Sequence, residues 1–205
     1  MAFFSFKNQK KTQRTVSFYD RENRIQNATD LKFFFNQTAS LTTSAPITFR
    51  GIPLSDITLE EIEAQLGEPI YIFDHQCRIA GHLVYYYKKK VEQLTLLTQL
   101  HFINEVFLLA VTKFSSDYVL GDADKTRLTA QIIKNYPGIT LNPEQHTLKF
   151  KDADGHVIFT EDNVFCFLHY VSNSNRVQKL KTQINWENLA QTTSDTTNES
   201  IDNFI

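Results

Sequence analysis

The segment Ile57–Phe114 constrains the fold of this chain more than any other part of its sequence. It opens with Thr58 and Glu61, a Thr-x-x-Glu pattern in which side chains and backbone amides cap one another at the start of a helix. Gly67 is the residue type that most often ends a helix. The pattern therefore predicts a short helix over 59–66, with one apolar stripe that must pack against another element.

Beyond this helix the spacing of apolar side chains changes to one that is typical of strands. The pattern predicts strands over 70–73, 82–91, 94–102 and 106–114. The last three are joined by short connections, of which Ile103–Glu105 predicts a tight turn. Strands joined so closely are antiparallel neighbours, so we expect a meander.

A second series of a helix and strands follows. Asp122 or Asp124 is expected to cap a helix that Pro137–Gly138 ends. Asp152–Gly155 is a strong signal for a hairpin turn. The pattern predicts strands on both sides of it, over 146–151 and 156–161, then a strand over 163–171 and a helix over 177–189.

The order of these elements predicts an α+β fold in which short helices pack on antiparallel β-sheet. We expect a globular region over 15–190, either as one domain or as two helix–sheet units in tandem over 47–116 and 117–175. A flexible basic segment, 1–14, is expected before it, and a disordered acidic tail, 191–205, after it.

The residues before the first capped helix give weaker signals. Residues 15–19 predict a strand and 20–23 a turn. Residues 28–36 fit either a short helix or a strand, because their apolar residues follow neither period. Residues 38–46 are rich in Ser and Thr and predict a loop, and 47–49 predict a short strand.

Composition places the chain among soluble globular proteins. Of its 205 residues 41% are hydrophobic, which is enough for a packed core, and the net charge of -2 is not that of a general nucleic-acid binder. Only 6 glycines are present, so we expect left-handed turn positions to be few or to fall on Asn and Asp. No stretch is long and apolar enough to span a membrane. We expect a cytoplasmic location, with Cys77 and Cys166 as small buried side chains.

The segment 1–14 also suggests a contact with a membrane surface. Its phenylalanines can enter the interface while its lysines meet anionic headgroups. The residues concerned are Phe3, Phe4, Phe6, Lys7, Lys10 and Lys11. The alternative is a frayed, solvated terminus.

The run from Ile57 to Pro69, Ile-Thr-Leu-Glu-Glu-Ile-Glu-Ala-Gln-Leu-Gly-Glu-Pro, is followed by Tyr85-Tyr-Tyr87 in a predicted strand. This arrangement resembles the helix–sheet module of the β-lactamase-inhibitor-protein-like and small outer-membrane-lipoprotein families. The resemblance covers residues 57–114. It implies helices packed on an antiparallel sheet and a function in binding other proteins, and it implies no catalytic residues.

Two patterns suggest metal ligands. His75, Cys77 and His82 offer imidazole and thiolate groups of the kind that zinc prefers, although their spacing matches no known zinc finger. Asp152–Gly155 fits part of a calcium-loop register, but Phe150 stands where the first ligand should be. We favour a hairpin turn there, and polar turn residues with a packed thiol in the first case, and we predict no cofactor.

Other patterns suggest little chemistry. No nucleophile motif or phosphate-binding loop is present, and the acidic pair Glu161–Asp162 is expected to be solvated at a strand end. Tyr86, Lys88 and Lys90 alternate onto one face of a strand and could contact single-stranded nucleic acid. An amphipathic strand with a charged end is the simpler interpretation.

We therefore expect a non-catalytic, cytoplasmic protein-interaction module of bacterial type, with an unknown protein partner. One alternative is a small-molecule-binding protein or an enzyme with a pocket between helix and sheet, lined by Tyr and His and holding a shifted titratable group. The other is a peripheral membrane protein that uses residues 1–14.

Overall fold

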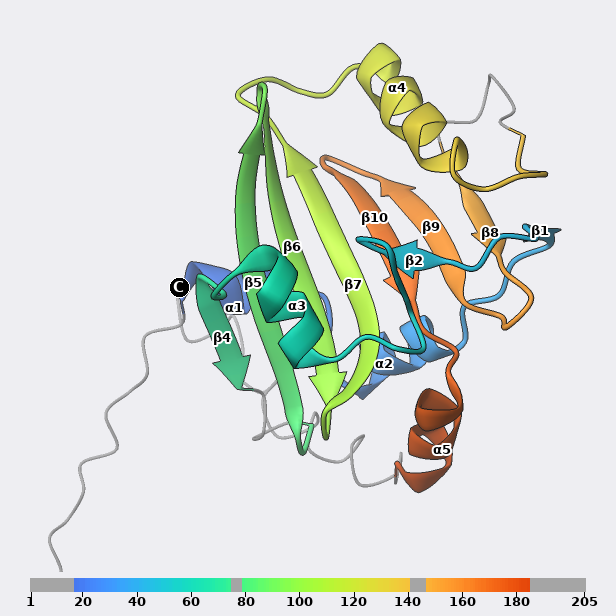
Figure 1. The fold of residues 1–205 in the computed structure, drawn as a ribbon. Helices are drawn as coiled ribbons and strands as arrows, with labels where there is room; N and C mark the ends of the chain where they lie inside the picture. Colours follow the sequence, from blue (N-terminus) through green and yellow to red (C-terminus); the bar gives the residue numbers. More distant parts are fainter. Residues whose placement is uncertain (1–16, 75–78, 141–146, 185–205) are drawn as a thin grey trace, which may run out of the picture.

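The computed structural model describes residues 17–74, 79–140 and 147–184. Its centre is an eight-stranded sheet in the order β1-β8-β9-β10-β7-β6-β5-β4, antiparallel throughout except for the pair β1–β8 (Figure 1). A separate hairpin, β2–β3, lies against one face. The predicted α+β class, with helices packed on largely antiparallel sheet, is confirmed.

The elements have the following bounds. The strands are β1 Leu41–Thr42, β2 Thr48–Phe49, β3 Ile52–Pro53, β4 Tyr71–Asp74, β5 His82–Val91, β6 Leu94–Ile103, β7 Val106–Ser115, β8 Lys149–Lys151, β9 Val157–Asp162 and β10 Cys166–Val171. The helices are α1 Phe18–Glu22, α2 Ala28–Phe35, α3 Leu59–Leu66, α4 Asp122–Ile133 and α5 Asn175–Gln183.

Helix α3 forms as its sequence predicts. The Thr58 side chain accepts a hydrogen bond from the Glu61 amide at 3.2 Å, and the Glu61 carboxylate accepts one from the Thr58 amide at 3.1 Å. Gly67 ends the helix at φ 75°, and the chain enters the meander β4-β5-β6-β7 in which each strand pairs with the next.

The second series extends the same sheet. Strand β10 pairs with β7 over six residue positions, so that β8-β9-β10 and β4-β5-β6-β7 meet at one central seam. Helices α3 and α4 both pack on the same face of the sheet (Figure 1). Strands from both predicted units thus belong to one continuous sheet, and α3 and α4 lie on the same face of it.

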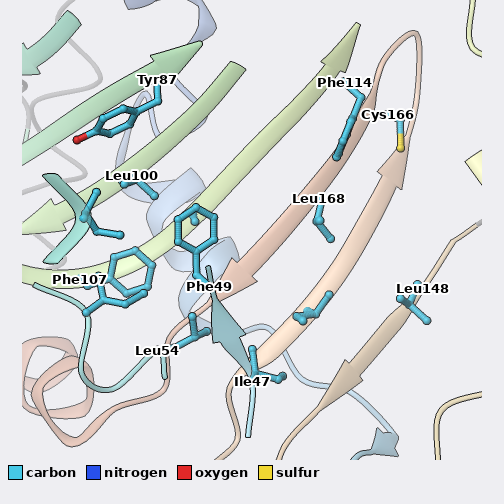
Figure 2. Packing of buried hydrophobic residues seen from close by; sticks show 14 of the residues in the cluster. Ile47, Phe49, Leu54, Tyr87, Leu100, Phe107, Phe114, Leu148, Cys166 and Leu168 are labelled. Atoms are coloured by element: carbon cyan, nitrogen blue, oxygen red, sulfur yellow. The ribbon is translucent and has the colours of Figure 1, made fainter. Parts of the chain in front are cut away.

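The sheet separates two packed layers. One face carries an apolar cluster with α3, α4 and the β2–β3 hairpin, in which Phe49, Leu100 and Leu168 are buried (Figure 2). Helices α2 and α5 cover the other face, where Phe34 and Val177 are buried. Helix α1 lies over the β4–β5 end of that second face, where Tyr19 packs against the cluster that holds Tyr86.

The first described residues correct one prediction. A strand was predicted over 15–19, but Phe18–Glu22 is a helix. Ser17 caps it, because its hydroxyl accepts from the Asp20 amide at 3.2 Å while the Asp20 carboxylate accepts from the Ser17 amide. This Ser-x-x-Asp pattern is a helix start, and it outweighs the apparent alternation of the apolar residues. Residues 28–36, left open between helix and strand, form α2 with Asn27 as its cap.

Smaller corrections concern turns and caps. The predicted loop 38–46 contains β1, and the N-cap of α4 is Gly121, with no side-chain cap bond, instead of Asp122 or Asp124. Outside glycine, left-handed backbone falls on Arg50, Glu92, Asn104 and Glu105 among the described residues, so Asn and Asp do not hold most of these positions.

Several predictions lie outside the described residues: the basic segment 1–14, the tail 191–205, and the residues His75 and Cys77. Within the described part of the chain, no helix has the length and apolar character needed to cross a membrane.

Candidate ligand-binding site

The sheet face beneath α1 and α2 carries an unusual number of buried polar side chains. They share one face because of the strand register, in which Gln99 lies opposite Val111, Val111 opposite His169, and Lys113 opposite Phe167. The set comprises His82, Tyr86, Gln99, His101 and His169, all fully buried, with Lys113 and Glu161 mostly buried beside them. Buried polar groups cost free energy unless they are paired, so their partners define what this face does.

Side chains of the sheet hold the α1–α2 segment in place through its backbone. Gln99 donates from Nε2 to the Glu22 carbonyl at 2.6 Å and accepts from the Arg24 amide at 3.1 Å. The Tyr86 hydroxyl donates to the Tyr19 carbonyl at 2.8 Å. These bonds fix the chain between the two helices at a set height above the sheet.

Two ion pairs join the same segment to the sheet. Lys113 Nζ lies 2.7 Å from a Glu22 carboxylate oxygen, and Arg24 lies 2.5 Å from a Glu161 oxygen. The Arg24 guanidinium also stacks over the Phe167 ring, 4.5 Å from its centroid. We expected Glu161 to be solvated at a strand end. Instead, the segment that contains Arg24 covers its carboxylate, and the Arg24 guanidinium forms an ion pair with it.

His169 lies behind this layer. Its ring stacks on Phe159 with centroids 4.3 Å apart and planes 6° apart, and Phe34 covers it. Its Nε2 lies 3.5 Å from Glu161, at the outer limit of a hydrogen bond, and neither ring nitrogen has a closer partner among the described residues. Burial lowers the pKa of His169, and the contact with His169, assisted by Arg24, lowers the pKa of Glu161. The imidazole is therefore held neutral beside a charged carboxylate.

A pocket opens next to this layer, between the α1–α2 segment and the sheet. Its volume is about 350 Å³. Its walls combine polar and aromatic side chains, which include Arg21, Asn23, Arg24, Phe33, Phe34 and Phe167. The size is at the lower end of the range for small-molecule sites.

The polar atoms that are still unpaired around this pocket are hydrogen-bond donors. Asn23 Nδ2 and Arg24 Nε are buried and have no partner among the described residues, and Arg21 forms no ion pair there. The two carboxylates of the walls are already engaged. Glu22 accepts from Lys113, and Asp30 accepts from the Gln26 amide at 2.8 Å. The pocket wall thus holds donors whose acceptor is not found among residues 17–74, 79–140 and 147–184.

The three residues that could contact single-stranded nucleic acid do not form one exposed surface. The Tyr86 ring is fully buried, and burial raises its hydroxyl pKa. Lys88 and Lys90 lie at the exposed end of β5. Tyr86 therefore has no ring face on the surface next to these two lysines.

The metal candidates are only partly within the described residues. His82 Nε2 lies 3.1 Å from Nδ1 of His101, a residue that sequence reasoning missed, and the two rings stack. Cys166 and His169 lie three positions apart on β10 and face opposite sides of the sheet, so the thiol and the imidazole do not converge.

The Asp152–Gly155 turn joins β8 and β9 as the predicted hairpin. Ligand atoms of Asp152, Asp154 and His156 lie within 4.8 Å of one another. However, the Asp152 carboxylate accepts from the Ile47 and His156 amides at 2.8 and 2.9 Å, and His156 Nδ1 accepts from the Asn173 amide. These hydrogen bonds explain why the three side chains lie together, because they hold the turn in place.

No family model matches the chain, and no curated protein or solved structure matches it.

Proposed function

We propose that this protein binds a small molecule that carries a carboxylate, in the pocket between the α1–α2 segment and the sheet. The observation that carries the proposal is a set of donors in the pocket wall: the exposed cation Arg21, which has no ion pair among the described residues, and the buried, unpaired Asn23 Nδ2 and Arg24 Nε. An anionic acceptor would satisfy them by charge-assisted hydrogen bonds, which are the stronger kind. Asn23 Nδ2 and Arg24 Nε are closed to solvent, so the pocket wall must shift slightly before either atom can donate to the ligand.

The aromatic walls indicate the rest of the ligand. Phe33 is about half exposed at the pocket, with Phe34 and Phe167 deeper in the wall. Burying an apolar group against them would add to the affinity. A flat aromatic or short aliphatic body attached to the carboxylate suits this combination.

Binding is proposed and not catalysis. Among the described residues of the pocket wall there is no Cys, Ser or His to act as nucleophile or base. His169 lies behind Phe34 and is fully buried, so a ligand in the pocket does not touch it.

The test uses benzoate, phenylacetate and hexanoate as probes, with benzamide and benzylamine as matched neutral and cationic compounds. We expect at least one carboxylate to bind by calorimetry and to raise the melting temperature, and the amide and amine to do neither. Arg21→Gln should weaken binding about tenfold, as the loss of one charge-assisted bond predicts. Arg127→Gln, at an exposed arginine on α4, is the control. Equal binding of benzamide, or no binding of any carboxylate at millimolar concentration, would refute the proposal.

A protein-interaction role, which the sequence favours, stays a prediction. Within the described residues, the surface that best fits such a role is an apolar patch where the loop after β7 meets the β9–β10 turn. Val119 and Val164 are 84% and 82% exposed there, beside Tyr118 and Phe165. Exposed apolar clusters often mark contact surfaces.

A further inference from the structure

A second pocket lies on the opposite face of the sheet, between the end of α3, the β2–β3 turn and strands β5 and β6. Its volume is about 340 Å³. The sequence suggested a pocket between helix and sheet lined by Tyr and His; the described wall of this pocket holds Tyr87 and no His. The residues that matter for its chemistry are Arg50, Glu68, Tyr87 and Lys89.

The charges around this pocket are mainly positive. Arg50 and Lys89 supply these charges, with Glu68 as the one acidic side chain among the described wall residues. Lys88 also borders the pocket, but strand alternation turns its side chain to the opposite face of β5. Neither Arg50 nor Lys89 forms an ion pair with any residue in 17–74, 79–140 or 147–184. Two unpaired cations around a concave surface attract an anion.

Arg50 is held at the pocket by a strained turn. It has φ 56° and Gly51 has φ 84°, in a tight turn that joins Phe49 to its partner Ile52. Turns with two left-handed residues favour Asn or Gly at the first position, because the Cβ atom of most L-residues is disfavoured in left-handed backbone. The turn places Arg50 in the wall of this pocket.

Tyr87 supplies an unsatisfied hydroxyl at the inner wall. Its side chain is 7% exposed, and its oxygen has no partner among the described residues. In Figure 2 this oxygen points away from the apolar cluster that surrounds the ring. Burial, followed by Glu63 and Tyr85, raises the pKa of Tyr87 to about 12. The hydroxyl is a donor with no acceptor among the described residues, and it reaches a ligand only after a small shift of the wall, because its oxygen is closed to solvent.

We infer that this pocket binds the phosphate group of a small molecule. The chemistry fits a dianion, because lysine ammonium groups and a guanidinium are the usual partners of phosphate and a tyrosine hydroxyl can donate the third kind of bond. A phosphate in single-stranded nucleic acid is the less suitable source. Such ligands need exposed aromatic rings for stacking, and the rings of Tyr85, Tyr86 and Tyr87 are all buried. This inference is independent of the carboxylate pocket.

The test measures calorimetric binding of pyrophosphate and of a ten-residue oligothymidylate to the full chain. We expect pyrophosphate to bind and the oligonucleotide to bind no better per phosphate. Two variants separate binding from folding. Arg50→Asn places a residue suited to the turn, so we expect equal or greater thermal stability with about tenfold weaker binding. Tyr87→Phe removes a buried unsatisfied hydroxyl, so we expect unchanged or greater stability with weaker binding.

Neighbouring lysines give a matched control. Lys89 lines the pocket and Lys90, on the other side of β5, does not, so Lys89→Gln should weaken pyrophosphate binding and Lys90→Gln should not. Equal losses from both would show non-specific charge attraction and overturn the inference. So would tighter binding of the oligonucleotide, full affinity in Arg50→Asn and Tyr87→Phe, or no binding of pyrophosphate at millimolar concentration. Arg21→Gln should leave pyrophosphate binding unchanged, which distinguishes the two pockets.

Discussion

His169 and Phe159 stack face to face on the neighbouring strands β10 and β9, with ring planes 6° apart. The imidazole is enclosed between this ring and Phe34, and within the described part of the chain Glu161, at 3.5 Å, is its acidic neighbour. A protonated ring in that position would be a poorly solvated charge, which is why burial lowers the pKa of His169.

The first prediction concerns acid stability. In the unfolded chain His169 regains its ordinary pKa near 6.5, so just below that pH the unfolded state binds more protons than the folded state. The free energy of unfolding should therefore fall as the pH drops from 6.5 toward the lower pKa of the folded state. Glu161, whose pKa is also lowered, contributes stability that is lost only below its ordinary value of 4.5.

His169→Phe isolates this effect. We expect the variant to show a smaller loss of stability between about pH 6.5 and 5, measured by urea unfolding at several pH values. Part of the slope will remain, since burial lowers the pKa of His156 as well. A slope identical to that of the original chain would contradict the assignment.

The second prediction concerns the pair formed by Arg24 and Glu161. Glu161→Gln leaves a half-buried guanidinium without its counter-charge and should cost about 1–3 kcal/mol. A double-mutant cycle with Arg24→Met should give a favourable coupling energy. The exposed pair Arg127–Glu92, at 3.7 Å, is the control, and its coupling should be below about 0.5 kcal/mol. Equal coupling in both pairs would show that the α1–α2 segment is not held as described.

The third prediction tests the cap of α3. Thr58→Ala removes the acceptor for the Glu61 amide and should lower the free energy of unfolding by about 1 kcal/mol. Thr58→Ser keeps the hydroxyl and should be close to the original. Chemical denaturation followed by far-ultraviolet circular dichroism measures both, and a loss of the same size in the serine variant would point to packing of the methyl group instead.

The fourth prediction separates a structural turn from a calcium site. The two Asp152 oxygens already accept backbone amides, so Asp152→Ala should cost about 2–3 kcal/mol by leaving buried donors unpaired. For the same reason millimolar calcium should not raise the melting temperature of the original chain. A calcium-dependent rise that disappears in Asp154→Asn would show that the cluster binds the ion.

Local signals in the sequence predicted the parts of the fold that depend on near neighbours. The Thr58–Glu61 box sets α3, and the short links after Val91 and Ile103 set the meander. The same hairpin register places Val84 opposite His101 and His82 opposite Ile103. His82 and His101 are therefore diagonal neighbours on one face, and their contact could have been predicted from the pairing of the two strands.

The buried polar side chains beneath α1 and α2 could not be predicted as one layer from local signals, and the reason is physical. Arg24 and Glu161 are 137 positions apart, and nothing in the residues around either one indicates the other. Arg50 is a similar case, because its role depends on how the β2–β3 turn lies over strands β5 and β6. Alternation predicts which face of a strand a side chain occupies, but not which distant segment will cover that face.

The separation of Arg24 from Glu161 also has a consequence for biosynthesis. As the chain leaves the ribosome, the α1–α2 segment is made more than a hundred residues before β9 and β10, which carry the partner of Arg24 and one wall of the pocket. The meander can form during that interval, and with it the bonds from Tyr86, Gln99 and Lys113 to this segment, but the Arg24–Glu161 pair and the Phe167 wall cannot. We expect this pocket to be the last part of the domain to mature.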